Sequence, residues 1–397
     1  MKRRDFVIRS SSAVMASTIM YPTILKAKPS INIALVGAGR RGTWVLAKMI
    51  ETGRVNPVVL CDVWGEQIDR SKEFLKISSI KQSYNLDEVL KDSKIDAVIL
   101  ATPDHLHKDY AVRILEAKKH LYLEKPVTLK FGEGEIIQKA VSKSGMICQT
   151  GTQQRSSTMY RRVKQEFFSG TKLLGEVVFV RAVWSDFGWQ RRVIKPRPIP
   201  KDFRWEKFLG NAPNIPYEWA RYTAWRNYKE YGAGILSDLL THWADVAQWM
   251  MDDETPTNAV TTGGIYHLND GRSNPDTVNS IISYPKNWNL SFECSVLPVK
   301  NSHDSVLFLG TKGNLELFRA GYIYTPHGQP PRVFNNEEDL DLVHINNFLD
   351  AIEKGAKPLA PIEVGLQAVT PSHLATAAYW SGERMKLNED KSKIVEA

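Results

Sequence analysis

Residues Ile31–Gly42 place a short apolar run directly before a glycine-rich turn, and no other stretch restricts the fold of this chain as strongly. The run leads into Gly37, Gly39 and Gly42 in the spacing G-x-G-x-x-G, with a helix expected from Thr43. In this arrangement the first glycine permits a tight turn, the second lets the backbone approach a pyrophosphate, and the third allows a helix to pack closely on a strand. The diphosphate of a dinucleotide would then lie at the helix N-terminus, where unpaired N–H groups point toward it.

A second apolar run, Val55–Cys61, ends in Asp62, twenty residues after Gly42. An acidic side chain at this position accepts hydrogen bonds from the ribose hydroxyls of NAD and repels the 2′-phosphate of NADP. The two features together predict an NAD-binding βαβ unit. The alternative is a glycine turn and a surface aspartate that bind no ligand.

Apolar strands alternate with helical patterns as far as Thr150. The expected strands are Ile31–Val36, Val55–Asp62, Ile95–Ala101, His120–Glu124 and Met146–Thr150. Such alternation indicates right-handed βαβ units and therefore an α/β Rossmann domain with a doubly wound parallel sheet, which we expect over residues 28–150. Ligands of such sheets bind at the carboxyl ends of the strands, so the residues that follow each strand are candidates for the site.

Two polar stretches follow the third and fourth of these strands. The first is Thr102–His107 (TPDHLH) and the second is Glu124-Lys125-Pro126. A lysine at a strand end of the cofactor cleft is placed to contact the substrate or the nicotinamide, and the proline after it favours a cis peptide bond in a tight turn. Each stretch also has a structural interpretation, in which His107 caps the next helix and Lys125 is a solvated loop charge.

The pattern changes after Thr150. The segment Gly151–Arg155 (GTQQR) begins a crossing to a second domain, and a helix is expected over Met159–Phe168. Runs with a period of two then predict an antiparallel sheet with one exposed face, over Glu176–Ser185, Thr257–Tyr266, Thr277–Tyr284, Asn289–Pro298, Ser305–Gly310 and Asn314–Phe318. Late helices are expected at Leu340–Glu353 and Ile362–Arg384. Residues 151–397 are therefore predicted to form an α+β domain.

The stretch Gly232–Met250 carries the most chemical information in the second half. As one helix, it places Asp238, His242 and Asp245 on one face and apolar residues on another. A carboxylate one turn before a histidine orients the imidazole and raises its basicity, as a general base requires. Pairs with this spacing also occur on helix surfaces without any catalytic role.

Aromatic residues are concentrated around the same stretch. Seven of the eleven tryptophans lie between Trp184 and Trp249, together with several tyrosines that include Tyr222. Aromatic rings suit the apolar faces of sugars, and Arg221 and Arg226 offer hydrogen bonds to hydroxyl groups. The alternative is that these side chains pack a join between domains or a subunit interface.

Residues 1–27 are predicted to be an export leader. Arg3 and Arg4 are followed by Asp5, Phe6 and a weakly apolar segment, as in twin-arginine signals. The segment is too short and too often interrupted by polar residues for a spanning helix, so we expect a periplasmic or otherwise exported protein with no stable membrane insertion. The alternative is a basic N-terminus that is not a targeting signal.

Charge and cysteine content exclude further classes of protein. Removal of residues 1–27 takes away five basic residues and one acidic residue and lowers the net charge from +8 to +4, which gives no signal for nucleic acid. Cys61, Cys148 and Cys294 each lie in an expected strand. They are predicted to be buried free thiols, and we expect neither a disulfide framework nor a metal site.

The glycine loop, Asp62, the ATPxxxH run at residues 101–107 and the EKP triplet at residues 124–126 together resemble the Gfo/Idh/MocA family of NAD(P)-dependent oxidoreductases. The resemblance covers nearly everything after the leader. It implies that Lys125 lies beside the nicotinamide and that the bond between Lys125 and Pro126 is cis. It also implies a large open sheet that meets the nicotinamide end of the cofactor and often builds an oligomer interface, so a homo-oligomer is expected.

The resemblance also implies a catalytic pair. Asp238 and His242 form the D-x-x-x-H pattern that the family's sugar and polyol dehydrogenases use in catalysis, and Lys125 completes the expected catalytic set. The residues expected to contact NAD are Gly37, Gly39, Arg41, Gly42, Asp62, Thr102, Pro103, His107, Glu124, Lys125 and Gln153. The residues expected to contact the substrate are Arg155, Tyr222 and Arg226.

The expected activity is the NAD-dependent oxidation of a secondary hydroxyl of a sugar or glycoside. His242 takes the hydroxyl proton, Asp238 orients His242, Lys125 polarises the oxygen, and the hydride passes to C4 of the nicotinamide. Because little free NAD is present outside the cytoplasm, and a twin-arginine route carries folded proteins, a tightly held cofactor is expected.

Two other functions stay open. One is a redox-neutral glycosidase or epimerase that resembles glycoside hydrolase family 109, which shares the Gly-x-Arg-Gly turn seen at residues 39–42. Such an enzyme oxidises a sugar carbon, exploits the acidified neighbouring C–H and returns the hydride. The other is a non-catalytic sugar-binding protein that keeps the fold.

Overall fold

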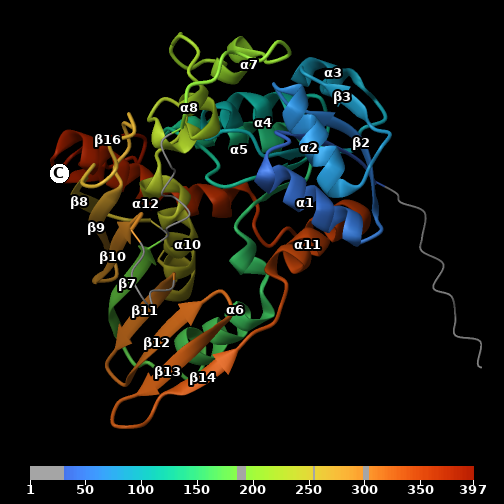
Figure 1. The fold of residues 1–397 in the computed structure, drawn as a ribbon. Coiled ribbons are helices and arrows are strands. Elements are labelled where there is room, and N and C mark those ends of the chain that lie inside the picture. The colour runs from blue at the N-terminus through green and yellow to red at the C-terminus, as the bar shows by residue number, and fades with distance from the viewer. Residues whose placement is uncertain (1–30, 186–193, 254, 298–303) are drawn as a thin grey trace, which may run out of the picture.

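The computed structural model describes residues 31–185, 194–253, 255–297 and 304–397. The expected leader at residues 1–27 lies outside these ranges. Two sheets organise the described chain (Figure 1). The predicted fold class is confirmed, because a parallel α/β Rossmann sheet is followed by a separate, large and mostly antiparallel sheet.

The first sheet has six parallel strands in the order β3-β2-β1-β4-β5-β6. Its strands are β1 (Ile31–Val36), β2 (Val55–Cys61), β3 (Lys81–Ser83), β4 (Ala97–Leu100), β5 (His120–Leu123) and β6 (Cys148–Thr150). Five of them match expected strands, whereas β3 is too short and polar to show an apolar period. The strand order changes direction at β1, so the loops after β1 and β4 diverge and leave a crevice at their carboxyl ends.

Helices pack on both faces of this sheet. They are α1 (Arg40–Glu51), α2 (Gly65–Leu75), α3 (Leu86–Lys91), η1 (Asp104–Leu106), α4 (His107–Glu116) and α5 (Glu133–Ser144). Ile33 and Leu35 of β1 share a buried cluster with α1, while Ala34 and Val36 share another with α4. The helix α1 begins at Arg40 rather than at Thr43, because extended Gly39 is already its N-cap. Its free N–H groups therefore lie within the glycine turn.

The second sheet has ten strands in the order β14-β13-β12-β11-β7-β10-β9-β8-β15-β16. Only β7 and β10 pair in parallel. The strands are β7 (Val177–Ser185), β8 (Asn258–Gly264), β9 (Thr277–Tyr284), β10 (Trp288–Ser295), β11 (Ser305–Gly310), β12 (Gly313–Phe318), β13 (Gly321–Pro326), β14 (Arg332–Asn335), β15 (Met385–Leu387) and β16 (Ile394–Glu396). The first six were expected, and the last four were not.

The helical elements after β6 lie between and beside the two sheets, and of these α10 and α12 pack against strands of the second sheet. They are η2 (Gln153–Ser156), α6 (Thr158–Val163), the π-helical turn η3 (Lys164–Ser169), α7 (Trp205–Leu209), α8 (Trp219–Thr223), η5 (Trp225–Asn227), α9 (Ile235–Asp238), α10 (Leu240–Met251), α11 (Leu340–Lys354) and α12 (Ile362–Ser381). The single helix expected over 232–250 is in fact two helices, which separate at Leu239. Because of this break, the side chains before Leu239 do not point in the direction that one continuous helix would give them.

The two late helices return to the first sheet. Phe348 and Leu349 of α11 are buried in one cluster with Ile33 and Leu35 of β1. Gln149 Nε2 of β6 also donates to a main-chain oxygen of α11 at 2.8 Å. The C-terminal part of the chain therefore completes the core around the first sheet, and the predicted domain limits of 28–150 and 151–397 stay a prediction.

One expectation on composition can be compared with the structure. All three cysteines are buried and free, as predicted. In the described ranges, no helix combines the length and the apolar character that a membrane crossing requires.

Candidate active site

The glycine loop joins β1 to α1. Gly37 has a φ of 91°, and a Cβ atom there would meet the backbone of Ala101. A Cβ atom on Gly42 would meet the carbonyl oxygen of Gly37, whereas Gly39 has open space where its Cβ atom would stand. Gly37 and Gly42 are therefore required by packing, and Gly39 leaves room for a ligand beside the N-terminus of α1.

Asp62 follows β2 and turns its carboxylate back toward the glycine loop. Its Oδ2 accepts a hydrogen bond from Ala38 N at 2.9 Å, and its Oδ1 accepts one from Trp64 N at 3.2 Å. Burial raises the pKa of this carboxyl to about 7, although the backbone N–H groups favour the ionised form. Each oxygen keeps a lone pair that a ribose hydroxyl can use.

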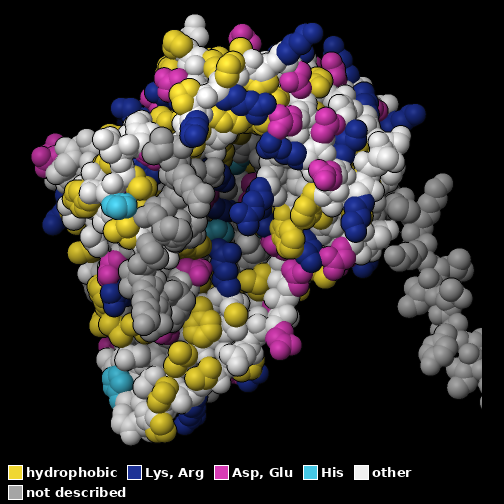
Figure 2. All heavy atoms as spheres, viewed as in Figure 1, with side chains coloured by type: hydrophobic (Ala, Val, Ile, Leu, Met, Phe, Trp, Pro, Cys, Tyr) yellow, Lys and Arg dark blue, Asp and Glu magenta, His cyan; other side chains and the backbone are white. Residues whose placement is uncertain are grey.

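A cavity of about 1430 Å³ connects the glycine loop and Asp62 with the second half of the chain. Figure 2 shows the molecule hollowed at this place, with Lys and Arg side chains along the edge. Most of the predicted site residues line the cavity: Gly37, Gly39, Arg41, Asp62, Thr102, Pro103, Glu124, Lys125, Gln153, Tyr222, Arg226, Asp238 and His242. Its volume exceeds the roughly 300–1,000 Å³ of ordinary small-molecule sites, which leaves room for a dinucleotide and a second ligand.

The lining fits NAD in its polar groups as well as in its size. Thr102 Oγ1 and Gln153 Oε1 are buried and have no hydrogen-bond partner within the described chain. A buried polar atom without a partner costs free energy, so these two atoms are suited to a polar ligand. No group of three or more His, Cys, Asp or Glu side chains in the described part of the chain is placed to hold a metal ion.

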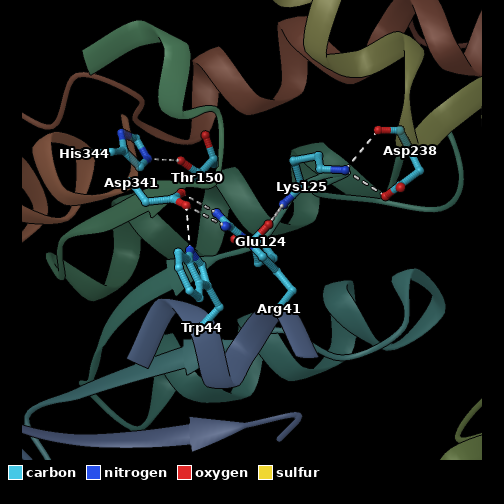
Figure 3. A network of polar contacts seen from close by, with 8 residues as sticks. All are labelled: Arg41, Trp44, Glu124, Lys125, Thr150, Asp238, Asp341 and His344. Atoms are coloured by element: carbon cyan, nitrogen blue, oxygen red, sulfur yellow. Dashed lines mark hydrogen bonds and ion pairs between the residues drawn. The ribbon is translucent and has the colours of Figure 1, made fainter. Parts of the chain in front are cut away.

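Lys125 follows β5 and reaches across the cavity to the second half of the chain (Figure 3). Its Nζ donates to Asp238 Oδ1 at 2.7 Å and to the Asp238 main-chain oxygen at 2.9 Å. Arg226 Nε lies 3.4 Å from the same Oδ1. Burial alone would raise the pKa of Asp238, but the positive charges of Lys125 and Arg226 outweigh it and lower the pKa to about 2. Three charged groups are thus fixed where the two halves meet.

His242 lies on α10 and stacks against Trp184, with ring centroids 5.8 Å apart. The structure differs from the expectation that Asp238 orients this imidazole. The break at Leu239 separates the two residues, and the Asp238 carboxylate faces Lys125 instead. Within the described chain, His242 Nδ1 has no hydrogen-bond partner.

The charge state of His242 follows from its surroundings. Burial lowers its pKa well below the ordinary value, and the positive charges of Lys125, Arg319 and Arg41 lower it further. The imidazole is therefore neutral near pH 7. A neutral imidazole at the wall of the cavity can accept a proton, which is the state that a general base requires.

Arg41 forms ion pairs on two sides. Its Nε donates to Glu124 Oε1 at 2.7 Å, and its Nη atoms donate to the two carboxylate oxygens of Asp341 at 2.9 and 3.1 Å. Asp341, in the first turn of α11, also accepts a hydrogen bond from Trp44 Nε1 at 2.9 Å. Glu124 Oε2 accepts one from Lys125 N at 3.2 Å. As Figure 3 shows, this network connects α11, the glycine loop and the EKP turn.

His107 is buried and does not belong to the described lining of the cavity. Its ring nitrogens lie 2.8 Å from Pro126 O and 3.0 Å from Thr102 O. Burial lowers its pKa to about 4. His107 therefore joins the loop after β4 to the turn at Lys125–Pro126, whose peptide bond is cis as expected. The sequence predicts that His107 contacts NAD directly, but its buried position outside the described cavity lining does not allow this contact.

Arg155 also differs from its predicted role as a substrate contact. Its Nε and Nη2 lie 2.9 and 2.8 Å from Asp245 Oδ1, and its guanidinium packs over Trp249 at 5.0 Å from the ring centroid. Arg155 is buried and is not part of the described cavity lining. The physical reason is that a buried arginine needs a carboxylate, and α10 supplies one.

Tyr222 lines the cavity, but it lies at the end near Asp62 and not at the expected substrate end near Lys125. Its ring lies 5.7 Å from that of Trp64, the second residue after Asp62. Burial raises the pKa of Tyr222, and the negative charge of Asp62 raises it further. Tyr222 therefore lies near the predicted ribose position, and only Arg226 of the three predicted substrate contacts lies near Lys125.

The sequence reasoning missed two charged residues of the site. Asp104, within the TPDHLH stretch, is buried and lines the cavity. Burial raises its pKa well above the ordinary value, although the positive charge of Arg226 opposes this shift. Its place just after a strand end was a signal that could have identified it. Arg319 lies in the turn between β12 and β13 and also lines the cavity, but no local pattern marks it.

Two protein-family models match the chain. One is described as the oxidoreductase family with an NAD-binding Rossmann fold, and it matches residues 31–152. The other is described as the GFO/IDH/MocA C-terminal domain, and it matches residues 160–316. The two matches together include all six strands of the first sheet and β7 to β11 of the second, and the second match ends within β12.

Characterised relatives share a smaller part of the sequence. The scyllo-inositol 2-dehydrogenase (NAD(+)) of Bacillus subtilis is 30% identical over 159 residues, which are 40% of this chain and 45% of the relative. Myo-inositol 2-dehydrogenase of Thermotoga maritima is 22% identical over 56% of each chain. A glycosyl hydrolase family 109 protein of Stenotrophomonas maltophilia is 25% identical over 55% of this chain and 46% of its own. The chain thus spans about half the length of the curated relatives it matches.

Solved structures share the fold over a longer stretch. Aldose-aldose oxidoreductase from Caulobacter crescentus, complexed with glycerol, has a TM-score of 0.69 at 17% identity over 90% of this chain and 100% of that chain. Levoglucosan dehydrogenase in complex with NADH and L-sorbose has a TM-score of 0.71 at 16% identity over 91% of this chain and 99% of that chain. At these identities the similarity concerns the fold alone.

Proposed function

Because the chain belongs to the Gfo/Idh/MocA family of NAD-binding oxidoreductases, we propose that it catalyses the NAD-dependent oxidation of a secondary hydroxyl on a sugar, a glycoside or a related polyol. One observation carries this proposal. The cavity that begins at Gly37 and Asp62 ends at Lys125 and at a neutral, cavity-lining His242. The names of the inositol dehydrogenases among the relatives support a polyhydroxylated substrate.

In the proposed reaction, NAD supplies the acceptor for the hydride when it is bound. The imidazole of His242 accepts the proton of the substrate hydroxyl. Lys125 Nζ donates a hydrogen bond to the same oxygen and stabilises its developing negative charge. Asp238 holds Lys125 in place through the contact at 2.7 Å and acts as a positioning residue for the lysine.

A redox-neutral reaction is the second candidate, and Asp104 favours it. A glycosidase or epimerase that returns the hydride needs a group that gives a proton back to the sugar or to a leaving group. Burial raises the pKa of the Asp104 carboxyl to about 8, which favours the protonated form near pH 7. A family 109 glycosyl hydrolase is among the relatives. Release of an aglycone from a glycoside without accumulation of NADH distinguishes this reaction from net oxidation.

We also propose that the protein is exported, holds its cofactor tightly and forms a homo-oligomer. The residues Arg3-Arg4-Asp5-Phe6 support export by the twin-arginine route. Exposed apolar side chains on the second sheet, such as Val178, Ile281 and Val333, support an interface between copies. A reporter fused to residues 1–35 should leave the cytoplasm, and replacement of Arg3 and Arg4 by lysine should stop it.

The activity is tested on protein loaded with NAD. Mass spectrometry of the purified protein identifies any nicotinamide that it carries, and a panel of sugars, inositols and glycosides is then mixed with it while NADH absorbance is recorded. His242→Ala should slow the rise of the NADH signal by roughly 10²- to 10⁴-fold, whereas His327→Ala, at an exposed histidine, should not slow it. Binding of a sugar without any NADH signal or chemical change would favour the non-catalytic alternative.

A further inference from the structure

Residues 197–227, which we name the cover, pass over the turn between β2 and α2. The cover contains α7, α8 and η5, and Figure 1 shows α7 and α8 in the upper part of the molecule. Trp219, Tyr222 and Trp225 of the cover line the same cavity as Asp62. One wall at the predicted ribose position therefore comes from the second half of the chain and not from the Rossmann sheet.

The cover is anchored at the N-terminus of α2. Asp202 Oδ2 accepts a hydrogen bond from Gly65 N, the first residue of that helix, at 3.0 Å. The dipole of an eleven-residue helix favours a carboxylate at this end. A Cβ atom on residue 65 would overlap this carboxylate, so a glycine is what lets Asp202 approach. Arg204 N adds a main-chain hydrogen bond to Val63 O at 2.9 Å.

Trp64 is the centre of the contacts between the turn and the cover. Its ring meets Phe203, Trp219 and Tyr222 edge to face, with centroids 6.3, 5.3 and 5.7 Å away. The guanidinium of Arg197 lies 5.2 Å from the same ring. These contacts leave Trp64 only 1% exposed. The cover and the turn after Asp62 are therefore packed as one unit.

Trp64 also has an unused donor. Its Nε1–H is buried and has no hydrogen-bond partner within the described chain. A buried N–H without an acceptor costs about 1–3 kcal/mol. Because Trp64 lines the cavity, a bound ligand can supply the acceptor.

Through α7 the cover is also attached to the loop after β4. His105 Nε2 lies 2.8 Å from Phe208 O, and the two rings are in contact with centroids 5.7 Å apart. The cover therefore bridges the loops after β2 and β4. In a Rossmann sheet these loops flank the adenosine half of a dinucleotide.

We propose that the cover encloses the adenosine half of bound NAD, that Trp64 Nε1–H donates to an acceptor atom of the adenosine, and that release of the cofactor is slow because the cover must lift first. This inference rests on the proposed function, since it takes NAD as the occupant of the cavity. Trp64, Gly65 and Asp202 then retain the cofactor, and none of these residues belongs to the glycine loop or to the proposed catalytic groups.

The test measures how fast the protein releases NADH. Energy transfer from tryptophan to bound NADH reports occupancy, and an excess of NAD is then added so that the signal decays at the release rate. Asp202→Asn and Gly65→Ala each remove the charge-assisted contact at α2 and should speed release about tenfold or more. The double variant should be no faster than either single variant, because both changes remove one contact. Asp69→Asn, on the exposed side of the same helix, should change nothing.

Trp64→Phe keeps an aromatic ring in the packing and removes only the N–H donor. It should weaken NADH binding several-fold by calorimetry, and Trp380→Phe, at an exposed tryptophan, is the matched control. Release rates and affinities that are unchanged in Asp202→Asn, Gly65→Ala and Trp64→Phe would overturn the inference while leaving the oxidoreductase activity intact. A protein that retains NAD by these contacts but oxidises no sugar would overturn the proposed function instead. Wild-type protein that binds no NADH contradicts both.

Discussion

Lowering the pH should weaken the preference for NAD over NADP, because this preference depends on the charge of Asp62. Its carboxylate lies at the predicted ribose position, where Ala38 N and Trp64 N hold it by hydrogen bonds of 2.9 and 3.2 Å. Burial raises its pKa to about 7. The carboxylate that repels a 2′-phosphate is therefore present above pH 7 and is lost as the pH falls through this value.

The size of the effect follows from simple electrostatics. At a separation of about 5 Å and an effective dielectric constant of about 20, two unit charges repel by about 3 kcal/mol. This energy corresponds to a ratio of roughly one hundred between the dissociation constants of NADP and NAD. Two pH units below its pKa, only about one carboxyl in a hundred is ionised, so the ratio should fall toward the value for a neutral side chain.

The assay is a set of calorimetric titrations with both cofactors between about pH 5 and about pH 9. The 2′-phosphate also gains a proton near pH 6, so Asp62→Asn is needed as a control that keeps the shape and removes the charge. The variant should show a small ratio at every pH. A wild-type ratio that stays constant across this range, or an Asp62→Asn variant that keeps the full ratio, would refute the reasoning.

Three further changes test other parts of the site. His242→Ala should lower turnover by roughly 10²- to 10⁴-fold with little effect on NAD affinity, and it should remove the acidic limb of the pH–rate profile. In the wild type this limb should lie below the ordinary histidine value of about 6.5, because the neutral imidazole is the base and burial lowers its pKa. Lys125→Ala should reduce turnover and raise the pKa of Asp238 from about 2, measured by an NMR titration of its carboxyl group, since its main positive neighbour is gone. Arg155→Ala should lower the free energy of unfolding in urea by about 3–5 kcal/mol, because it removes the arginine that pairs with the buried Asp245 carboxylate. The exposed pair of Arg181 should be worth about 0–1 kcal/mol, and equal losses would contradict this.

The sequence was informative where local chemistry decides the structure. The glycine turn needs Gly37 and Gly42 for reasons of packing within a few residues, so its position and role were predictable. The strands β9 and β11 have the predicted bounds, because β9 alternates and is followed by Pro285, whereas β11 is a short apolar run that ends at Gly310. Edge strands such as β14 are short and largely exposed, and they show no period that could identify them.

The site differed from expectation where distant segments decide which groups meet. On one continuous helix, Asp238 and His242 would lie on the same face and could pair. The break at Leu239 and the positive charge of Lys125 instead pair Asp238 with the lysine. Arg155 was expected to contact the substrate, yet α10 supplies a buried carboxylate for it. In both cases the deciding partner lies about 90 residues or more away along the chain. Periodicity cannot report such contacts.

The central claim is that the cavity holds NAD at one end and that His242 removes a hydroxyl proton at the other. The most direct measurement is rapid mixing of NAD-loaded protein with the sugar, inositol and glycoside panel, recorded by NADH absorbance for wild type and His242→Ala in parallel. The account predicts that at least one compound gives a fast rise in wild type, and that His242→Ala shows no comparable rise although it still binds NAD. An equally fast rise in His242→Ala, or a panel whose compounds bind to the wild type at this cavity while none of them changes NADH, would contradict it.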